Sequence, residues 1–144
     1  MTLKKIFLLL LTTIYLMPSQ AQEKIIPIAQ IPEPVKQFVL QHFEKSNIIS
    51  AIKEKEVLNY ELEIKLNDRT KLTFDKNNVL TEIESPGGIP LKLLNDTIYE
   101  IVRNNYPNQK ITSWEKTKLG QKVELDNDVD LFFDNNGNVL RAGH

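Results

Sequence analysis

Two short runs of oxygen-bearing side chains near the C-terminus have the alternating spacing at which calcium ligands recur in proteins. The runs are Asp126, Asp128 and Asp130, then Asp134, Asn136 and Asn138. No glutamate closes either run, and Gly137 is displaced from the position that the glycine of an EF-hand loop takes. Asp and Asn are also the residues that tight turns favour. We therefore interpret both runs as turns and predict no metal site.

Paired carboxylates are the next candidates for chemistry. Glu61 with Glu63, and Glu124 with Asp126, alternate along expected strands, so each pair shares one face. Paired acids catalyse reactions only where a cleft drives their pKa values apart. On an open strand near Lys65, a solvated charged face explains them better. With no cysteine and no G-x-S-x-G motif in the chain, we predict a protein that is not an enzyme.

The two histidines do not suggest a zinc site either. His42 lies on the apolar stripe of an expected helix, where a hydrogen-bonded side chain at the edge of the core is the simplest interpretation. His144 is the last residue. Zinc sites need several histidine or cysteine ligands, and we predict no cofactor.

Two aromatic residues are more informative. Phe132 alternates with Leu131 and Phe133, so it should point away from the core if those two point inward. Trp114 stands where the first part of the chain has Ala51. An exposed aromatic pair could anchor a partner, while packing between the two parts of the chain is the alternative. The predicted partner-binding residues are Trp114, Phe132, Asp130, Glu124 and Thr73.

These residues lie on elements that occur twice. Residues 72–80 read LTFDKNNVL and residues 131–140 read LFFDNNGNVL, which predicts a strand, a polar turn and a returning strand each time. Asn136-Gly137 favours a type I′ hairpin. Before each phrase comes an apolar stripe of helical spacing, and the second stripe follows the first by 63 residues. The stripes are Val35, Phe38, Val39, His42 and Phe43, then Ile98, Ile101, Val102, Asn105 and Tyr106.

The resulting fold prediction is α+β, with two tandem repeats. Each repeat, residues 31–84 and 89–144, is expected to pack one helix on a four-stranded antiparallel meander and leave the other sheet face open. The helices are predicted at about 33–44 and from Asn95 or Asp96 onwards, with proline or an N-cap at their start. Residues 22–30 are expected to be an extended lead-in, and 85–88 a linker.

The N-terminus predicts export. Lys4 and Lys5 precede an apolar run, Pro18 ends it, and Ser19-Gln20-Ala21 supplies small residues for cleavage after Ala21. Residues 1–21 are thus interpreted as a signal peptide, which makes the chain periplasmic or secreted, with no membrane anchor after cleavage. Without Lys4 and Lys5 the 18 basic side chains become 16, against 19 acidic ones, a formal charge of −3. Nucleic acid is therefore not an expected partner.

The order of these phrases resembles the PepSY-like domains of exported bacterial proteins, in particular the β-lactamase-inhibitor-like group. The residues that carry the resemblance are Ile31-Pro32, Val35, Phe38, Tyr60-Glu61-Leu62 and Leu72 to Asp75, then Tyr106-Pro107, Ile111, Trp114-Glu115-Lys116 and Phe133 to Leu140. The resemblance covers nearly all of the chain after Ala21. It implies export, a helix-and-sheet fold and a binding or inhibitory role, with no catalytic residues.

The functional prediction is a non-catalytic exported protein, an inhibitor or accessory factor, that binds a protein or peptide through an open sheet face. Two alternatives stay open: a structural or accessory domain that self-associates, and a module that binds a metal or small ligand. The identity of the partner and the oligomeric state are not predicted.

Overall fold

The structure, a computed structural model, describes residues 22–55 and 60–143. The predicted signal peptide, residues 1–21, and His144 lie outside the described residues. In chain order the elements are β1 (Gln22–Ile25), η1 (Ile28–Gln30), α1 (Glu33–His42), β2 (Ile48–Lys55), β3 (Tyr60–Leu66), β4 (Lys71–Phe74), β5 (Leu80–Glu84), η2 (Leu91–Leu93), α2 (Asp96–Asn105), β6 (Ile111–Thr117), β7 (Gly120–Leu125), β8 (Asp130–Phe133) and β9 (Val139–Gly143), where η marks a 3-10 turn.

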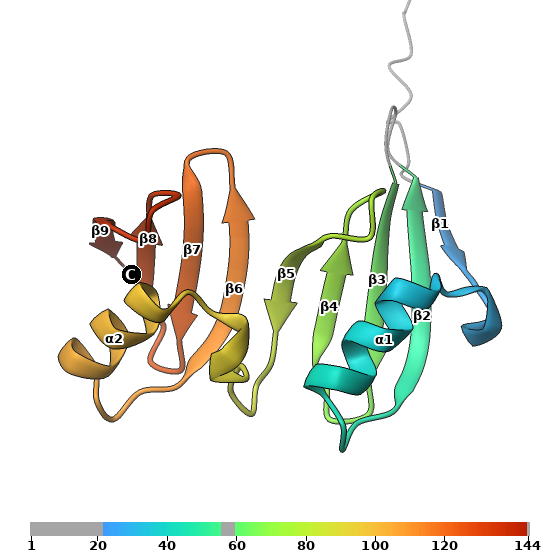
Figure 1. Cartoon of the computed structure of the whole chain (residues 1–144), viewed down its shortest axis with the longest axis horizontal. Helices are drawn as coiled ribbons and strands as arrows, with labels where there is room; N and C mark the ends of the chain where they lie inside the picture. The colour runs from blue at the N-terminus through green and yellow to red at the C-terminus, as the bar shows by residue number, and fades with distance from the viewer. Residues whose placement is uncertain (1–21, 56–59, 144) are drawn as a thin grey trace, which may run out of the picture.

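One antiparallel sheet of nine strands, in the order β1 to β9, runs through the molecule (Figure 1). The prediction of two repeats, each with its own four-stranded sheet, is therefore wrong. The expected lead-in forms β1 and pairs with β2, from Gln22 opposite Lys55 to Ile25 opposite Ile52. In addition, β5 pairs with β6. Each of these pairings satisfies backbone donors and acceptors that an edge strand would leave open.

Strand β5 belongs to both sides of this sheet. It pairs with β4, with Leu72 opposite Ile83, and with β6, with Ile83 opposite Trp114. Below, the first half denotes residues 22–84, the second half residues 89–143, and the linker residues 85–88. The linker does not separate two sheets, because strands on either side of it are hydrogen-bonded neighbours.

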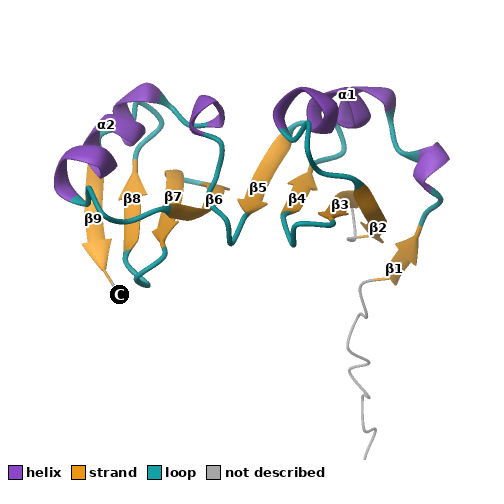
Figure 2. Ribbon diagram, turned by 90° about the horizontal axis from the view of Figure 1, so that it is seen from below, coloured by secondary structure: helices purple, strands orange, loops and turns teal. Residues whose placement is uncertain are grey.

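Both helices start where local chemistry favours a start and cover the same face of the sheet (Figure 2). Helix α1 has a proline in its first turn and Glu33 at its positive end. Helix α2 is capped by Asn95, whose side chain accepts a hydrogen bond from the Thr97 N–H at 2.8 Å. Among the described residues, no helix lies on the opposite face, which we call the open face.

The core lies between the helices and the covered face of the sheet. Val35 and Val39 of α1 are buried, as are Ile98 and Val102 of α2, which follow them by 63 residues. On the strands the buried residues alternate with polar ones, as in Leu62, Ile64 and Leu66 of β3. Each fully buried side chain of this size stabilises the fold by roughly 1.5–3 kcal/mol relative to an exposed one.

The two repeated phrases form loops that are organised by an aspartate. Asp134 accepts hydrogen bonds from the N–H groups of Asn136 (2.8 Å) and Asn138 (2.9 Å). Asp75 does the same for Asn77 (2.8 Å) and Val79 (2.9 Å). The predicted type I′ turn at Asn136-Gly137 is wrong, because Gly137 has a positive φ of 87° and Asn136 does not. The Asp134 carboxylate instead stabilises a five-residue loop between β8 and β9.

Gly120 begins β7, directly after the β6–β7 hairpin turn, and lacks space for a side chain. A Cβ atom there would overlap the carbonyl oxygen of Phe133 on β8. We predict that Gly120→Ala lowers the free energy of unfolding by about 2–4 kcal/mol, as a severe backbone clash does. Chemical denaturation of both proteins measures this difference. Gly87→Ala is the matched control, since a Cβ at Gly87 meets nothing within 4 Å; equal losses for the two variants would contradict the prediction.

Candidate functional site

A row of side chains crosses the open face from β3 to β9. Residues directly opposite each other on neighbouring strands share a face, and the strand registers align one residue of each strand in this row. Its members are Glu63, Thr73, Glu82, Glu115, Lys122, Phe132 and Arg141. Phe132 is the single aromatic side chain in it. The row therefore joins two predicted site residues, Thr73 and Phe132, across both halves.

The next row holds two more of the predicted residues. Glu124 of β7 lies opposite Asp130 of β8 on the open face. Asp130 forms an ion pair with Lys122 at 3.0 Å. Lys122 thus connects the two rows, and Glu124, Asp130 and Phe132 lie together on the open face of the second half.

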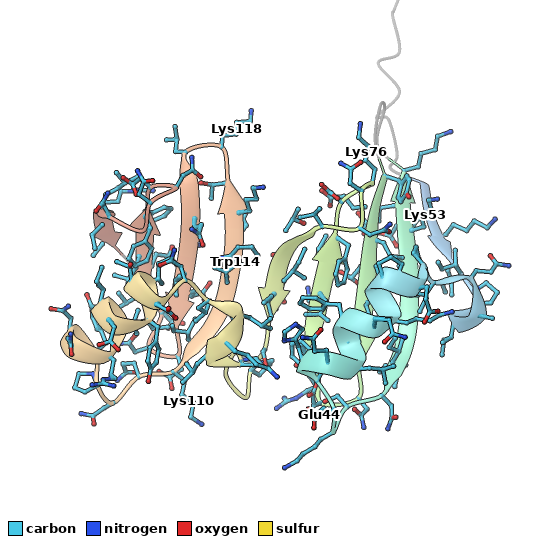
Figure 3. All side chains as sticks on the ribbon, viewed as in Figure 1. Glu44, Lys53, Lys76, Lys110, Trp114 and Lys118 are labelled. Atoms are coloured by element: carbon cyan, nitrogen blue, oxygen red, sulfur yellow. The ribbon has the colours of Figure 1, made fainter. Side chains whose placement is uncertain are left out.

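Trp114 lies on the opposite face from these residues. Its neighbours in register are Ile83 and Val123, both fully buried. The indole packs against the core, and its Nε1 donates a hydrogen bond to Gln121 Oε1 at 2.8 Å. Figure 3 shows it on β6, at the boundary between the halves. The structure therefore does not bring Trp114 and Phe132 together as an exposed pair; packing at the boundary is what it shows for Trp114.

Phe132 is half-buried between two cations. The guanidinium carbon of Arg141 lies 3.8 Å from the centre of the phenyl ring, and Lys122 Nζ lies 5.9 Å from it. A cation over an aromatic face is attracted by the ring quadrupole. Arg141 therefore holds the ring in place and leaves positive charge beside an apolar surface. This arrangement suits an apolar group that carries a nearby carboxylate.

The boundary between the halves is acidic on the open face. Glu82 and Glu115 lie directly opposite each other in the β5–β6 ladder, which places like charges at the closest cross-strand position. Burial, and then the charges of Glu84 and Glu115, raise the pKa of Glu82, although Thr73 Oγ1 donates to its carboxylate at 3.2 Å. A hollow of about 480 Å³ lies here, lined by residues that include Glu82, Glu115 and Lys122.

Ion pairs cover much of the remaining open face. Lys71 Nζ lies 2.7 Å from Glu84, and Lys65 Nζ lies 3.1 Å from Glu63. The hydrogen bond to Glu84 raises the pKa of Lys71. The interpretation of Glu63 as part of a charged, solvated face agrees with this pairing. At exposed positions such pairs contribute little stability individually.

The three aspartates with calcium-like spacing, Asp126, Asp128 and Asp130, make different contacts and do not converge on one point. Asp126 accepts a hydrogen bond from the Lys110 N–H at 3.1 Å, whereas Asp130 pairs with Lys122. Asp128 has a positive φ of 64° and forms the turn. Within residues 22–55 and 60–143, no group of three or more histidine or acidic side chains is placed to hold a metal ion.

His42 differs from its expected hydrogen-bonded state. Its ring packs on Phe38, with the centroids 4.6 Å apart. Nδ1 is buried, and no hydrogen-bond partner for it occurs in the described part of the chain. Burial, followed by the charge of Lys92, lowers the pKa of His42. Burial thus favours the neutral form of the imidazole, which packs on Phe38.

Comparison of the sequence with models of known protein families identifies the family of this chain. A family model described as "Putative beta-lactamase-inhibitor-like, PepSY-like" matches residues 17–82 and 66–141. The chain belongs to this PepSY-like family. The two PepSY-like matches overlap in residues 66–82, which contain β4 and the beginning of β5. The overlap agrees with the position of β5, which is hydrogen-bonded to strands of both halves.

Solved structures with the same PepSY-like fold come from Bacteroides. A "putative calcium-regulated periplasmic protein" from Bacteroides thetaiotaomicron has 28% sequence identity and a TM-score of 0.80, over 85% of this chain and 97% of that one. A "putative periplasmic protein" from Bacteroides vulgatus has 27% identity and a TM-score of 0.77, with the same coverage. A second protein from Bacteroides vulgatus, with 20% identity and a TM-score of 0.80 over 85% of this chain and all of that one, shares the fold. A search among curated proteins found no match.

The structural relatives are described as periplasmic proteins. In the described part of this chain, neither helix has the length and apolar character that crossing a membrane requires.

Sequence reasoning missed two features of the PepSY-like open face. The Glu82–Glu115 pair was not expected, because the β5–β6 register is set by backbone pairing over a boundary that the sequence marks as a linker. Arg141 was not expected either, although its place one strand beyond Phe132 would follow once the loop length between β8 and β9 is known.

Glu82 provides a test of the acidic boundary. Its folded-state pKa lies above the ordinary value of 4.5, so protonation favours the fold. That contribution is complete below the unfolded pKa and is lost as pH rises through the folded pKa. We predict that Glu82→Gln raises the melting temperature at pH 7 and that the difference narrows toward pH 4. Thermal denaturation from pH 4 to pH 8 measures it.

Glu84→Gln is the matched control, because Glu84 pairs with Lys71 at 2.7 Å and its removal should not stabilise the protein at pH 7. A Glu82→Gln melting temperature that is lower at pH 7, or displaced equally at every pH, would show that the opposed charges do not destabilise the boundary.

Proposed function

We propose that this chain is an exported, non-catalytic binding protein that captures a protein or peptide through the open face of its sheet. The observation that carries the proposal is the open face itself: a continuous surface of nine strands without a covering helix among the described residues. The row of side chains from Glu63 on β3 to Arg141 on β9, which we call the central row, combines one aromatic residue with charges of both signs. This combination is typical of surfaces that bind proteins.

Export is supported by two independent observations. Residues 1–21 have the composition of a signal peptide, with cleavage after Ala21. The solved relatives with 27–28% identity are described as periplasmic. We therefore propose that the mature protein begins at Gln22 and acts in the periplasm or outside the cell.

Phe132 is the proposed anchor of the contact. It lies in the central row, with Arg141 at 3.8 Å on its face. Asp130, Glu124 and Thr73 lie in the same or the adjacent row and are the proposed polar contacts around it. Trp114 packs against the core on the other face, so its proposed role is to hold the boundary between the halves in shape.

An inhibitory or accessory role fits this proposal, since the family model carries an inhibitor-like description. The mature chain offers no cysteine nucleophile and no G-x-S-x-G motif, and we propose no catalytic activity.

Self-association is the second candidate function, and the sheet edges favour it. Strands β1 and β9 each have one neighbour, and Ile25, Val139 and Leu140 on them are exposed. Edge strands with apolar side chains are templates for pairing with another chain. Sedimentation at several protein concentrations distinguishes the two, because edge pairing gives assembly that depends on concentration.

Partner binding is tested by two aromatic substitutions. We predict that Phe132→Ser leaves the melting temperature nearly unchanged and weakens partner binding by about 2 kcal/mol or more, as expected for a hot-spot residue. Trp114→Ala should instead destabilise the fold by about 2–3 kcal/mol, because it removes a packed indole from the boundary. The partner is first captured from the exported fraction by the mature chain and identified by mass spectrometry, and binding of the purified partner is then measured by calorimetry.

One relative is described as calcium-regulated, so the same titration is performed with calcium and with a chelator. Full affinity of the Phe132→Ser variant for the purified partner would exclude Phe132 as the anchor. Loss of folding in that variant would assign it to the core.

A further inference from the structure

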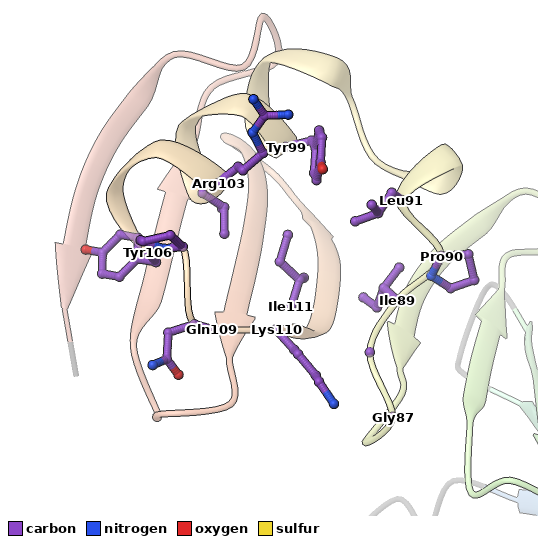
Figure 4. Close-up of a pocket in the computed structure, with 13 residues that line it drawn as sticks. Gly87, Ile89, Pro90, Leu91, Tyr99, Arg103, Tyr106, Gln109, Lys110 and Ile111 are labelled. Carbon is purple, nitrogen blue, oxygen red and sulfur yellow. The ribbon is translucent and has the colours of Figure 1, made fainter.

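A second hollow lies on the helix side of the second half, between α2 and the segment that leads into it (Figure 4). Its volume is about 460 Å³, within the range of about 300–1,000 Å³ typical of sites for small molecules. We call it the linker groove. Because α2 contributes one wall, the groove is separate from the open face of the sheet.

The interior of the linker groove is apolar. Ile89, Val102 and Ile111 are each nearly buried, with exposed fractions of 5%, 4% and 5%. Leu91 forms an outer wall and is 51% exposed. Tyr99 projects from α2 into the gap opposite Leu91 (Figure 4). A ligand here would cover mainly the exposed side chain of Leu91, because the three interior residues are already nearly buried.

Hydrogen bonds within the protein fix the walls of the linker groove. The Ile89 N–H donates to the Ile111 carbonyl at 2.9 Å, and the Gly88 N–H donates to the Ser85 carbonyl at 2.9 Å. Lys92 Nζ reaches across to the Gln41 carbonyl at the end of α1, at 3.1 Å. The segment opposite α2 is thus attached both to β6 and to the first half, and the groove is pre-formed.

The charge around the groove is positive at both ends. Figure 4 shows Arg103 at one end and Lys110 at the other. None of the 13 residues that line the groove is acidic, although the chain as a whole has a formal net charge of −1. Arg103 has a contact with Glu100 at 3.9 Å, with both side chains more than half exposed. Such a pair contributes little free energy, so an anionic head group can compete for the guanidinium.

These features are particular to the second half. Counting back 63 residues, the positions of Tyr99, Arg103 and Lys110 are occupied by Lys36, Leu40 and Asn47. The first half therefore has neither the aromatic wall nor the two cations at the corresponding places. Packing of the helix on the sheet, which both halves share, does not require these residues.

We propose that the linker groove binds an amphipathic organic anion, a small molecule with an aromatic or aliphatic body and one carboxylate, sulfonate or phosphate head group. The body packs against Leu91, over the small accessible parts of Ile89, Val102 and Ile111. The head group is bound at one end of the groove, by Arg103 or by Lys110. This site is independent of the partner surface around Phe132.

The test uses the mature chain and the fluorescent probe 1-anilinonaphthalene-8-sulfonate, which has an aromatic body and one anionic head group. We expect saturable fluorescence enhancement that dodecanoate competes away and that dodecyltrimethylammonium, of equal chain length and opposite charge, does not. At least one of Arg103→Glu and Lys110→Glu should weaken probe binding about tenfold or more, as loss of a charge-assisted contact and repulsion imply, and the more affected variant identifies the end that binds the head group.

Matched variants separate the groove from other surfaces. Lys118→Glu makes the same charge change at the β6–β7 hairpin and should leave probe affinity within about twofold, since that exposed charge is remote and screened. Leu91→Ser should weaken binding, whereas Leu140→Ser, at another exposed apolar position on β9, should not. Phe132→Ser should also retain it, so a failure of the partner proposal leaves this result interpretable.

Several outcomes would overturn the proposal: no saturable signal, equal competition by the cationic amphiphile, or losses in both Arg103→Glu and Lys110→Glu that are no larger than the loss in Lys118→Glu. Amide chemical shifts give an independent readout. Probe-induced changes should cluster at Gly88, Leu91 and Arg103, and changes confined to β9 or to the open face would place the probe elsewhere. Thermal melts of every variant confirm that it is folded.

Discussion

Three residue pairs between β5 and β6 hold the two halves in one sheet. On the covered side of this ladder, Ile83 lies opposite Trp114 and contributes to the core. On the open side, Glu82 lies opposite Glu115 and the two charges repel. Apolar burial on one face therefore offsets like-charge repulsion on the other. The continuity of the open face and the path of the linker both depend on this ladder.

The features that the sequence predicts correctly are those set by the pattern of apolar and capping side chains. The apolar stripes located α1 and α2, and the cap at Asn95 is where it was expected. The alternation in β3 placed Leu62 and Ile64 in the core. These features depend on burial and on contacts within a few residues of the chain, and both leave a readable period in the sequence.

The β5–β6 and β1–β2 pairings could not be predicted from the side-chain pattern. Backbone groups of β5 and β6 make the connection, and they are the same for any sequence. The linker residues suggested a boundary between sheets, while the chain crosses back over the covered face and keeps β5 and β6 adjacent. For the same reason, the sequence predicts that Gln22–Ile25 is extended but does not predict that it pairs with another strand. The sequence shows that Trp114 stands where the first half has Ala51. Which face of the sheet it occupies depends on the register of β6 with its neighbours, which the sequence does not reveal.

The two candidate binding regions differ in their chemistry. The open face is broad, crossed by ion pairs and has one aromatic residue beside Arg141, which suits a large partner with mixed charge. The linker groove is apolar inside and cationic at its rim, which suits a small amphipathic anion. They lie on opposite faces of the sheet, so both can be occupied at once.

The shared strand β5 also makes the second half depend on the first. The first half contributes five strands, β1 to β5, whereas the second contributes four, β6 to β9, and uses β5 as its neighbour. Removal of the first half would therefore also remove the strand to which β6 is hydrogen-bonded, and the backbone groups on that side of β6 would be left without partners. The second half is in this sense completed by a strand that belongs to the first.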